Sequence, residues 1–457
     1  MEQIVEWTRY LAKNFWNTYT ISLLLGTGLL LTILTKGIQF RKMGTALKLM
    51  MKGALRKDMS AEEPGDISPF QALTTALSAT VGNGNIAGVA TSIVLGGPGG
   101  PFWMWITALV GMATKYSEGM LGVKYRHIAE DGSMAGGPMY YIKDGFQEIN
   151  YLKRLGAPLA GIFAVCGVWS ALFGTANMMQ SNSMALAFNS QFGIPFWLTG
   201  ITITTLTGMV IIGGIKRIVA VAEKLVPFMV ILYVGGALFI LIINIEKIPS
   251  ALLLIIKSAF TYQAPIGGFS GHAVMQSIRN GVNRGLLSNE SGLGSAPIAH
   301  GAAKTKDPIR QGLIAMTGTF IDTIIVCSMT ALVIIVTQSF TKIDPATGKT
   351  LTSTALTAEA FNSSIPYLGG FIISFGSFLF GLSTLIAWCY YGEQCLEYIF
   401  GIKITKYYRI LFIILCFTGS ILQGEKLNIV WDFGVVSLGV MAIPNPVSYT
   451  HLTLPTN

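Results

Sequence analysis

The chain has 457 residues, of which 52% are apolar and only 12% are charged, about half the charged share of a soluble domain. This composition excludes an ordinary soluble enzyme or binding domain and predicts a protein that crosses a membrane many times. The net charge of +9 does not indicate nucleic-acid binding, because most of the 31 Lys and Arg fall in connecting segments expected on one side of the membrane.

Hydropathy predicts an all-α polytopic membrane protein with about eleven transmembrane helices. Each expected span is a mainly apolar run of the ~20 residues that a helix needs to cross a bilayer, or longer, as at 158–188 and in the long, broken span at 267–300. In chain order these spans lie at about 18–36, 70–97, 102–122, 158–188, 194–213, 221–244, 267–300, 311–337, 367–390, 407–422 and 427–443.

The first connecting segment sets the expected orientation, because cytoplasmic segments are enriched in basic residues. We therefore expect the N-terminus outside and the C-terminus in the cytoplasm, in the plasma membrane and in contact with its lipids. The first span follows Glu2 and Glu6 rather than a basic stretch, so we expect it to remain as a helix and not to be a cleaved signal peptide. The basic residues of the segment are Lys36, Arg41, Lys42, Lys48, Lys52, Arg56 and Lys57.

The span at 70–97 is expected to break in its middle. Its centre, Thr80-Val-Gly-Asn-Gly-Asn85, holds two glycines and two asparagines. Glycine costs a helix about 1 kcal/mol relative to alanine, and asparagine competes for backbone hydrogen bonds. Irregular backbone at membrane depth must be buried in protein or line a watery cavity, and many transporters hold substrate and ion at such breaks. The alternative is a glycine-rich surface for close helix packing.

Ten spans remain when the first is set aside, and they divide into two sets of five that each begin with a glycine-interrupted segment. Because five is odd, the second set crosses the membrane in the opposite direction, which predicts two inverted repeats. The second break is expected either at Gly267–Gly271 or near Gly292–Gly294. The expected plan is a single transmembrane domain at 1–445, with an extra N-terminal helix and basic loop at 18–66, a first repeat at 67–245 and a second repeat at 246–445.

The motifs that the sequence lacks limit the possible functions. No glycine-rich phosphate loop or nucleophile motif appears, so we expect neither ATP use nor enzymatic activity.

Residues 446–457 are polar and uncharged and lack the basic residues expected after a last span. We expect this tail to be truncated or foreign and assign it no function.

Three stretches together resemble the alanine/glycine:cation symporter family of amino-acid transporters, over about residues 15–445. That resemblance implies the leucine-transporter fold, with two inverted five-helix repeats and here one extra N-terminal helix. It also implies co-transported sodium. The stretches are Gly96-Gly-Pro-Gly-Gly-Pro-Phe-Trp-Met-Trp105 with Gly111-Met-Ala-Thr-Lys-Tyr-Ser-Glu118, then Met134-Ala-Gly-Gly-Pro-Met-Tyr140, then Ser288-Asn-Glu-Ser-Gly-Leu-Gly-Ser-Ala-Pro297.

The first break is also similar to the Val-Gly-x-Gly-Asn pattern of sodium:neurotransmitter symporters. This likeness implies that Asn83 and Gly84 offer backbone N–H groups to a substrate carboxylate. It implies that Ser78 and Val81 offer carbonyl oxygens to sodium, and that Asn85 suits a second cation site. Two general preferences agree, since a helix N-terminus favours an anion and freed carbonyls favour a hard cation.

Polar residues later in the chain extend this expected site. Ser383 and Thr384 either bond back to their own helix or complete the sodium site with Ser78 and Val81, and the resemblance favours the sodium site. Trp388 is expected either to close over a small side chain or to belong to an interfacial aromatic belt.

Gln180 lies midway along the span at 158–188, where a buried amide needs a partner. We expect it to contact the substrate ammonium, with Asn177 on the same face as the second choice. Lys115 and Glu118, three residues apart on one helix, are expected to pair with each other or a neighbour.

An intramembrane carboxylate is a functional candidate by default, and Asp322 is one. It could be a cation ligand, a proton carrier, or a structural partner of Arg279 or Arg284. Glu290 could be a gate or a loop anchor near the cytoplasmic mouth.

These observations predict a secondary active symporter that imports a small neutral amino acid, alanine or glycine, with sodium by alternating access. The alternatives are proton coupling through Asp322 or Glu290 and, less favoured, a channel. A channel would need a continuous polar stripe or an oligomeric ring, and neither is visible in the sequence.

Overall fold

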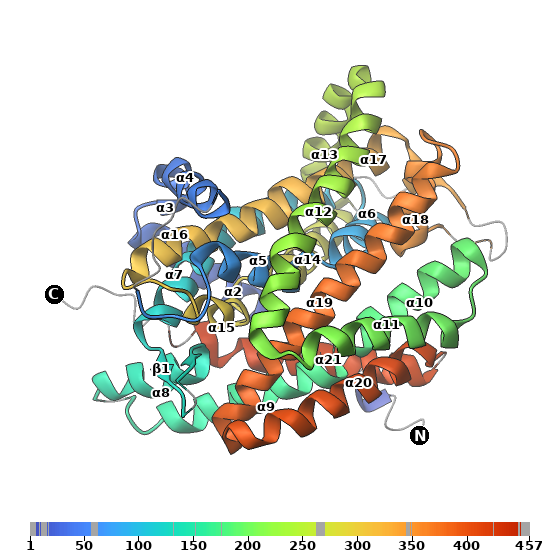
Figure 1. Ribbon diagram of the computed structural model, residues 1–457. Helices are drawn as coiled ribbons and strands as arrows, with labels where there is room; N and C mark the ends of the chain where they lie inside the picture. Colours follow the sequence, from blue (N-terminus) through green and yellow to red (C-terminus); the bar gives the residue numbers. More distant parts are fainter. Residues whose placement is uncertain are drawn as a thin grey trace.

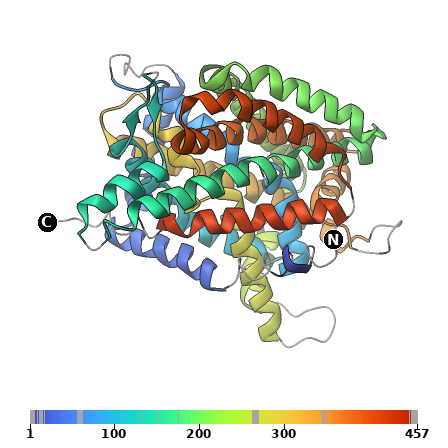
Figure 2. The ribbon, with the colours of Figure 1, turned by 90° about the horizontal axis from the view of Figure 1, so that it is seen from below.

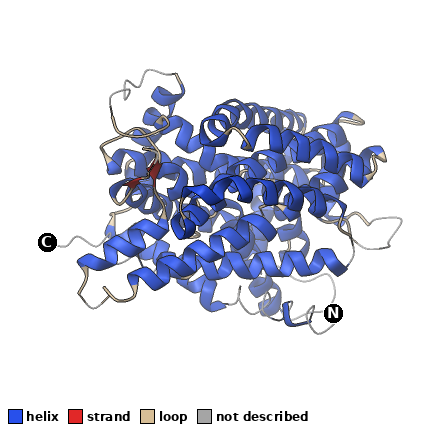
Figure 3. Ribbon diagram, turned by 60° about the horizontal axis from the view of Figure 1, so that its bottom comes forward, coloured by secondary structure: helices blue, strands red, loops and turns tan. Residues whose placement is uncertain are grey.

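The computed structural model describes residues 6–8, 10, 16, 18–55, 63–130, 132–150, 152–174, 176–261, 270–343, 348, 350–423, 425–446 and 448. These residues form a bundle of helices, joined by loops and by one short antiparallel pair of strands (Figure 3). The pair consists of β1 (His127–Ile128) and β2 (Met134–Ala135).

Every expected span is covered by a helix or by consecutive helices. Five helical segments among the described residues are long and apolar enough to cross a membrane. The chain is thus a multi-pass helical membrane protein, whereas the count of eleven spans stays a prediction. In the first half the helices are α2 (Thr18–Leu34), α3 (Ile38–Arg41), α4 (Met43–Ala54), α5 (Pro69–Thr80), η2 (Gly84–Gly88), α6 (Val89–Gly96), α7 (Gly100–Lys124), α8 (Pro138–Gly145), η3 (Phe146–Glu148), α9 (Gly156–Phe173), α10 (Met178–Phe192), α11 (Phe196–Ile211) and α12 (Gly214–Ile243).

In the second half, three short helices lie between the longer ones, and η5 is a wider π-helical segment that joins α16 to α17. The elements are η4 (Ile245–Lys247), α13 (Ile248–Thr261), α14 (Ser270–Asn289), α15 (Ala296–Gly301), α16 (Pro308–Thr319), η5 (Phe320–Cys327), α17 (Ser328–Val336), η6 (Ser339–Thr341), α18 (Ser353–Asn362), α19 (Leu368–Phe400), η7 (Ile402–Ile404), α20 (Thr405–Ile421) and α21 (Glu425–Ala442).

The expected span at 158–188 corresponds to one candidate membrane span, Gly156–Phe192, but it is interrupted, because α9 ends at Phe173 and α10 begins at Met178. A side chain at Gly174 would lie 2.6 Å from the Ser170 carbonyl oxygen and 3.2 Å from Gly434 of α21, so only glycine permits this close approach. The interruption places Gln180 in the first turn of α10.

The two discontinuous helices lie side by side near the middle of the bundle (Figure 1). α6 packs against α14, and α5 packs against α15. The two segments therefore run antiparallel, as inverted repeats require, although the full repeat plan stays a prediction. The second break falls at Glu290–Ser295, where Gly292 and Gly294 have φ of 91° and 83°. The rival position is not a break within the described residues, since α14 is already helical from Ser270, while Gly267 and Gly268 lie outside those residues.

Helices at the periphery present apolar side chains outward. α9 runs beside α21, and α11 runs beside α20 (Figure 2). On α12, Ile231 is 71% exposed and Phe239 is 54% exposed. Large apolar groups at this exposure fit a surface that faces lipid rather than water.

A single arginine ties the beginning of α5 to the end of α15. The guanidinium of Arg126, just after α7, donates to four backbone carbonyls at 2.5–3.0 Å. A backbone hydrogen bond from Lys304 to the Ile67 carbonyl, at 2.7 Å, joins the same two segments. We call this arrangement the Arg126 clamp; its four carbonyls belong to Pro64, Gly301, Ala303 and Thr305.

Candidate functional site

The expected first break is confirmed. α5 ends at Thr80, and Val81 has an extended conformation with φ of −76° and ψ of 92°. Helical structure resumes at Gly84, and the Gly82 N–H donates to the Asn85 side-chain oxygen at 2.9 Å. Among the described residues, no acceptor is recorded for the N–H groups of Asn83 and Gly84. Gly84 is exposed, and a side chain there would meet no atom within 4 Å.

Hydroxyl groups on other helices satisfy carbonyls beyond the break. Thr330 of α17 donates to the Asn85 carbonyl at 2.8 Å, and Thr357 of α18 donates to the Ile86 carbonyl at 3.1 Å. Such side-chain donors make irregular backbone tolerable at membrane depth. The break is therefore held in place by side chains far away in sequence, and this favours a specific site over loose glycine packing.

The residues expected to bind sodium do come together. The Ser78 hydroxyl donates to the Ser383 carbonyl at 2.8 Å, and the Ser383 hydroxyl lies 3.2 Å from the Ser78 carbonyl oxygen. The Thr384 hydroxyl oxygen would be 2.7 Å from a side chain at Gly82. Val81 is fully buried beside them, and no donor to its carbonyl is recorded among the described residues. These oxygens are the type of ligand that a hard cation prefers.

The alternative role of the two hydroxyls is also observed. Ser383 and Thr384 each donate to the Phe380 carbonyl of their own helix, at 2.8 and 2.9 Å. The two roles are compatible, because a hydroxyl has one proton to donate and two lone pairs to offer. A cation can therefore bind to these oxygens while both helix bonds remain.

On the other side of the break, Asn83 joins two helices. Its amide nitrogen donates to the Gln180 side-chain oxygen at 3.0 Å, and its own oxygen accepts from the Ser377 hydroxyl at 2.5 Å. Ser377 is absent from the expected site, although it precedes Thr384 by seven residues on the same face of α19. Asn177, the second choice to Gln180, instead donates to the Phe412 carbonyl of α20.

Trp388 lies at the second break. It is 2% exposed, which excludes a position in an interfacial belt, and its indole N–H donates to Glu290 at 3.1 Å. Glu290 also accepts from Ser295 at 2.5 Å, so it anchors the loop between α14 and α15. Trp388 lies one turn beyond Thr384 on α19, and its contact with substrate stays a prediction.

A layer of buried polar groups supports the first break from behind. The Asp322 carboxylate accepts from Asn85 at 2.7 Å, from Ser288 at 3.0 Å and from Thr323 at 2.7 Å. Within the described residues no arginine pairs with it, so the expected partnership with Arg279 or Arg284 is wrong. Neutral donors from three elements satisfy the carboxylate instead. The Asn85 oxygen is occupied by Gly82, and its role at a second cation site stays a prediction.

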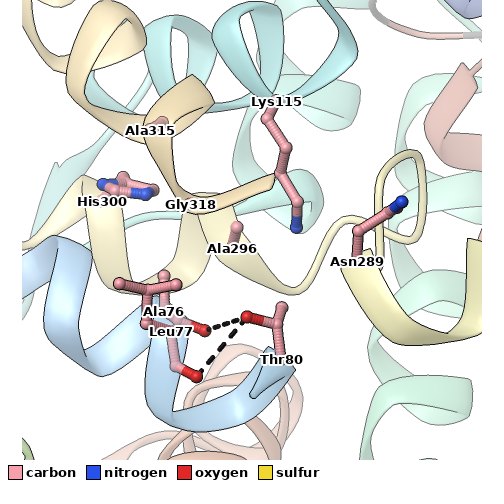
Figure 4. Close-up of a pocket in the computed structure, with 9 residues that line it drawn as sticks. All are labelled: Ala76, Leu77, Thr80, Lys115, Asn289, Ala296, His300, Ala315 and Gly318. Atoms are coloured by element: carbon pink, nitrogen blue, oxygen red, sulfur yellow. Dashed lines mark hydrogen bonds between the residues drawn. The ribbon is translucent and has the colours of Figure 1, made fainter. Parts of the chain in front are cut away.

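A small cavity opens next to α5 (Figure 4). The Lys115 ammonium points into it (Figure 4) and has no hydrogen bond within the described chain. The Asn289 amide nitrogen also has no hydrogen bond there. The expected Lys115–Glu118 pair is confirmed, with the ammonium 4.0 Å from a carboxylate oxygen. The cavity is small and most of its lining is apolar, apart from a few polar side chains. Its lining residues are Ala76, Leu77, Thr80, Lys115, Asn289, Ala296, His300, Ala315 and Gly318.

Replacing Lys115 by methionine should destabilise the protein by about 3–5 kcal/mol, because it leaves the buried Glu118 carboxylate without its counter-charge. The melting temperature of the purified protein in detergent measures this. Adding Glu118→Gln to Lys115→Met should recover much of the loss, whereas the exposed Lys124→Met should change little. A double variant no more stable than Lys115→Met would show that the charge pair is not the cause.

A bundle of apolar helices around a discontinuous helix, with paired N–H groups on one side and clustered oxygens on the other, is the architecture of a membrane transporter. The chain belongs to the sodium:alanine symporter family, whose profile matches residues 1–455. The sodium/alanine symporter AgcS of Methanococcus maripaludis is 46% identical over 440 residues, covering 96% of this chain and 92% of that protein.

Other relatives agree with this assignment. An uncharacterized transporter of Haemophilus influenzae is 47% identical, covering 96% of this chain and 91% of its own. A probable sodium/glutamine symporter of Bacillus subtilis, GlnT, is 35% identical, covering 98% and 88%. The protein is therefore a multi-pass membrane transporter and not an enzyme.

Proposed function

We propose that the protein is a sodium-coupled symporter that imports a small neutral amino acid, alanine or glycine, by alternating access. The observation that carries this proposal is the pair of N–H groups at Asn83 and Gly84, for which no acceptor is recorded among the described residues, with open space beside Gly84 at the N-terminal end of η2. A helix N-terminus is a ready-made binding site for a carboxylate. The family and the similarity to a sodium/alanine symporter support the substrate class.

Sodium would bind to the carbonyls of Ser78 and Val81 and the hydroxyls of Ser383 and Thr384. The substrate carboxylate would bind a few residues away along the same interrupted segment. Opposite charges on the two sides of one break attract each other, so each ligand strengthens the binding of the other. This mutual stabilisation is what couples the two fluxes.

The amino acid would be oriented by its other end. Gln180 reaches the break through Asn83, so its amide oxygen is well placed to accept from the substrate ammonium. Two inverted repeats would then rock around the occupied site, driven by the sodium gradient and by the membrane potential, which supplies about 2.3 kcal/mol per charge per 100 mV.

Uptake of radiolabelled alanine into proteoliposomes should depend on an inward sodium gradient and persist when the pH gradient is collapsed. Glycine and alanine should compete well and leucine poorly, because the family resemblance implies a pocket with little room beyond a methyl group. A control with equal sodium on both sides isolates the driving force. Strong competition by leucine would contradict the substrate class.

Proton coupling is the rival outcome of the same measurement. Asp322 is buried beside the break, and a Bacillus subtilis relative, YrbD, is named a putative sodium/proton-dependent alanine carrier. Uptake driven by a proton gradient in sodium-free buffer, and lost in Asp322→Asn, would reject sodium coupling. Flux that does not saturate with alanine would instead indicate a channel.

A further inference from the structure

Arg284 is a cation within the expected membrane depth, and among the described residues no carboxylate is recorded as its ion-pair partner. It is half-buried on α14, and no described residue forms a recorded hydrogen bond or ion pair with it. Ionisable residues inside a membrane protein face its interior or a watery cavity and normally have a partner. An arginine with no recorded partner among the described residues points to an anion supplied by a ligand.

Packing contacts place Arg284 close to the first break. A side chain at Gly88 of η2 would lie 3.9 Å from the Arg284 Cδ atom. Gly84, which borders open space, lies about one turn along the same helix from Gly88. The Arg284 side chain thus passes Gly88, which is four residues along the interrupted segment from Gly84.

The hydrogen bonds of Ser288 and Asp322 also place Arg284 near the first break. Ser288 follows Arg284 by one turn of α14 and donates to Asp322 at 3.0 Å. Asp322 in turn accepts from Asn85, next to Gly84. Arg284 therefore lies one turn beyond the layer of Ser288, Asp322 and Asn85, on the side where α14 packs against α6. The predicted orientation places this side outside the cell.

Asp322 does not neutralise Arg284. Its carboxylate accepts from Asn85, Ser288 and Thr323, and among the described residues no arginine contacts it. The guanidinium of Arg284 consequently remains available. Guanidinium groups bind carboxylates through two parallel hydrogen bonds, which makes arginine suited to this ligand.

The geometry points to an outer carboxylate-binding site at Arg284, which holds the incoming amino acid one turn before it reaches the first break. This inference rests on the proposed function. The substrate carboxylate would leave the guanidinium for the N–H groups of Asn83 and Gly84 as it moves inward. Arg284 then speeds the capture of substrate without contributing to the final bound state.

Transport by Arg284→Gln in proteoliposomes tests this site. The KM for alanine should rise about tenfold or more, since a charged hydrogen-bonded pair is lost, while equilibrium alanine binding at saturating sodium stays within about twofold of the wild type. Arg284→Lys should recover part of the KM. Arg279→Gln removes the same charge from an exposed position on the same helix and should leave the KM unchanged.

Propionate, which has the carboxylate but no ammonium, should inhibit wild-type uptake and inhibit Arg284→Gln much less, while ethylamine inhibits neither. An unchanged KM in Arg284→Gln would overturn the inference. The inference would also be overturned if Arg284→Gln and Arg284→Lys raised the KM equally and both lowered the melting temperature. That result would show that Arg284 has a structural role. Uptake that falls when chloride is replaced by methanesulfonate, only with Arg284 present, would assign the position to chloride. Loss of sodium-dependent alanine uptake in the wild type would instead reject the proposed function.

Discussion

Gly84→Leu should abolish sodium-dependent alanine binding in protein that still folds. The Cβ atom of the new side chain would have no heavy atom of another segment within 4 Å, so the leucine begins in open space beside η2. It would occupy the position proposed for the substrate carboxylate. Two hydrogen bonds to a charged group are worth about 1.5–3 kcal/mol each, so we expect at least a ~100-fold loss of affinity.

Equilibrium binding of radiolabelled alanine to the purified protein measures this loss. Gly84→Ala should keep most of the affinity, because a methyl group leaves the N–H groups accessible. Gly161→Leu on α9 is a matched control, since that glycine also has no neighbour within 4 Å but lies far along the chain from the break. If Gly84→Leu binds alanine with wild-type affinity, the substrate carboxylate does not bind at this position.

Replacing Ser383 and Thr384 together by alanine should raise the sodium concentration for half-maximal uptake about tenfold or more. Both hydroxyl oxygens lie against the first break, and Ser383 also reaches the Ser78 carbonyl at 3.2 Å. Their loss removes two of the proposed cation ligands. The affinity for alanine at saturating sodium should change much less, because none of the lost groups is expected to touch the amino acid.

Sodium titration of uptake, paired with alanine titration at saturating sodium, separates the two effects. Thr418→Ala is the matched control, because the Thr418 hydroxyl bonds only to its own helix, at 2.9 Å from the Ile414 carbonyl. Thr384→Ser should retain most of the sodium affinity. If the folded double variant shows an unchanged sodium dependence, the two hydroxyls do not bind sodium and serve only as hydrogen-bonding groups of their own helix.

The two breaks that are rich in glycine were predicted from their local composition. The interruption between α9 and α10 was missed, because the composition there is that of an ordinary apolar helix. Two glycines and two asparagines within Thr80–Asn85 disfavour a helix strongly enough to be read directly. The interruption between α9 and α10 lies inside an apolar run, and at Gly174 the chain comes close to Gly434 of α21, which is far away in the sequence. Hydropathy reports composition along the chain and cannot report such tertiary contacts.

The candidate site follows the same division. The oxygens of Ser78 and Ser383 were predicted to meet because a family pattern places them, and Ser377 could have been found from its seven-residue spacing to Thr384. The partners of Asp322 could not be predicted. The sequence suggested Arg279 or Arg284 as the partner of Asp322, whereas in the structure its carboxylate accepts from the neutral side chains of other residues. Trp388 and Glu290 are 98 residues apart, and no periodicity connects them.

The Arg126 clamp has a mechanical consequence for transport. One guanidinium joins the segment before α5 to the segment after α15, so the ends of the two discontinuous helices on that side are linked to each other by hydrogen bonds. Neither helix can then swing open alone without breaking several hydrogen bonds to charged donors. If the protein works by the alternating access proposed above, an exit on that side would open by a tilt of both helices together, and this tilt would disturb the proposed sodium and substrate sites at the same time.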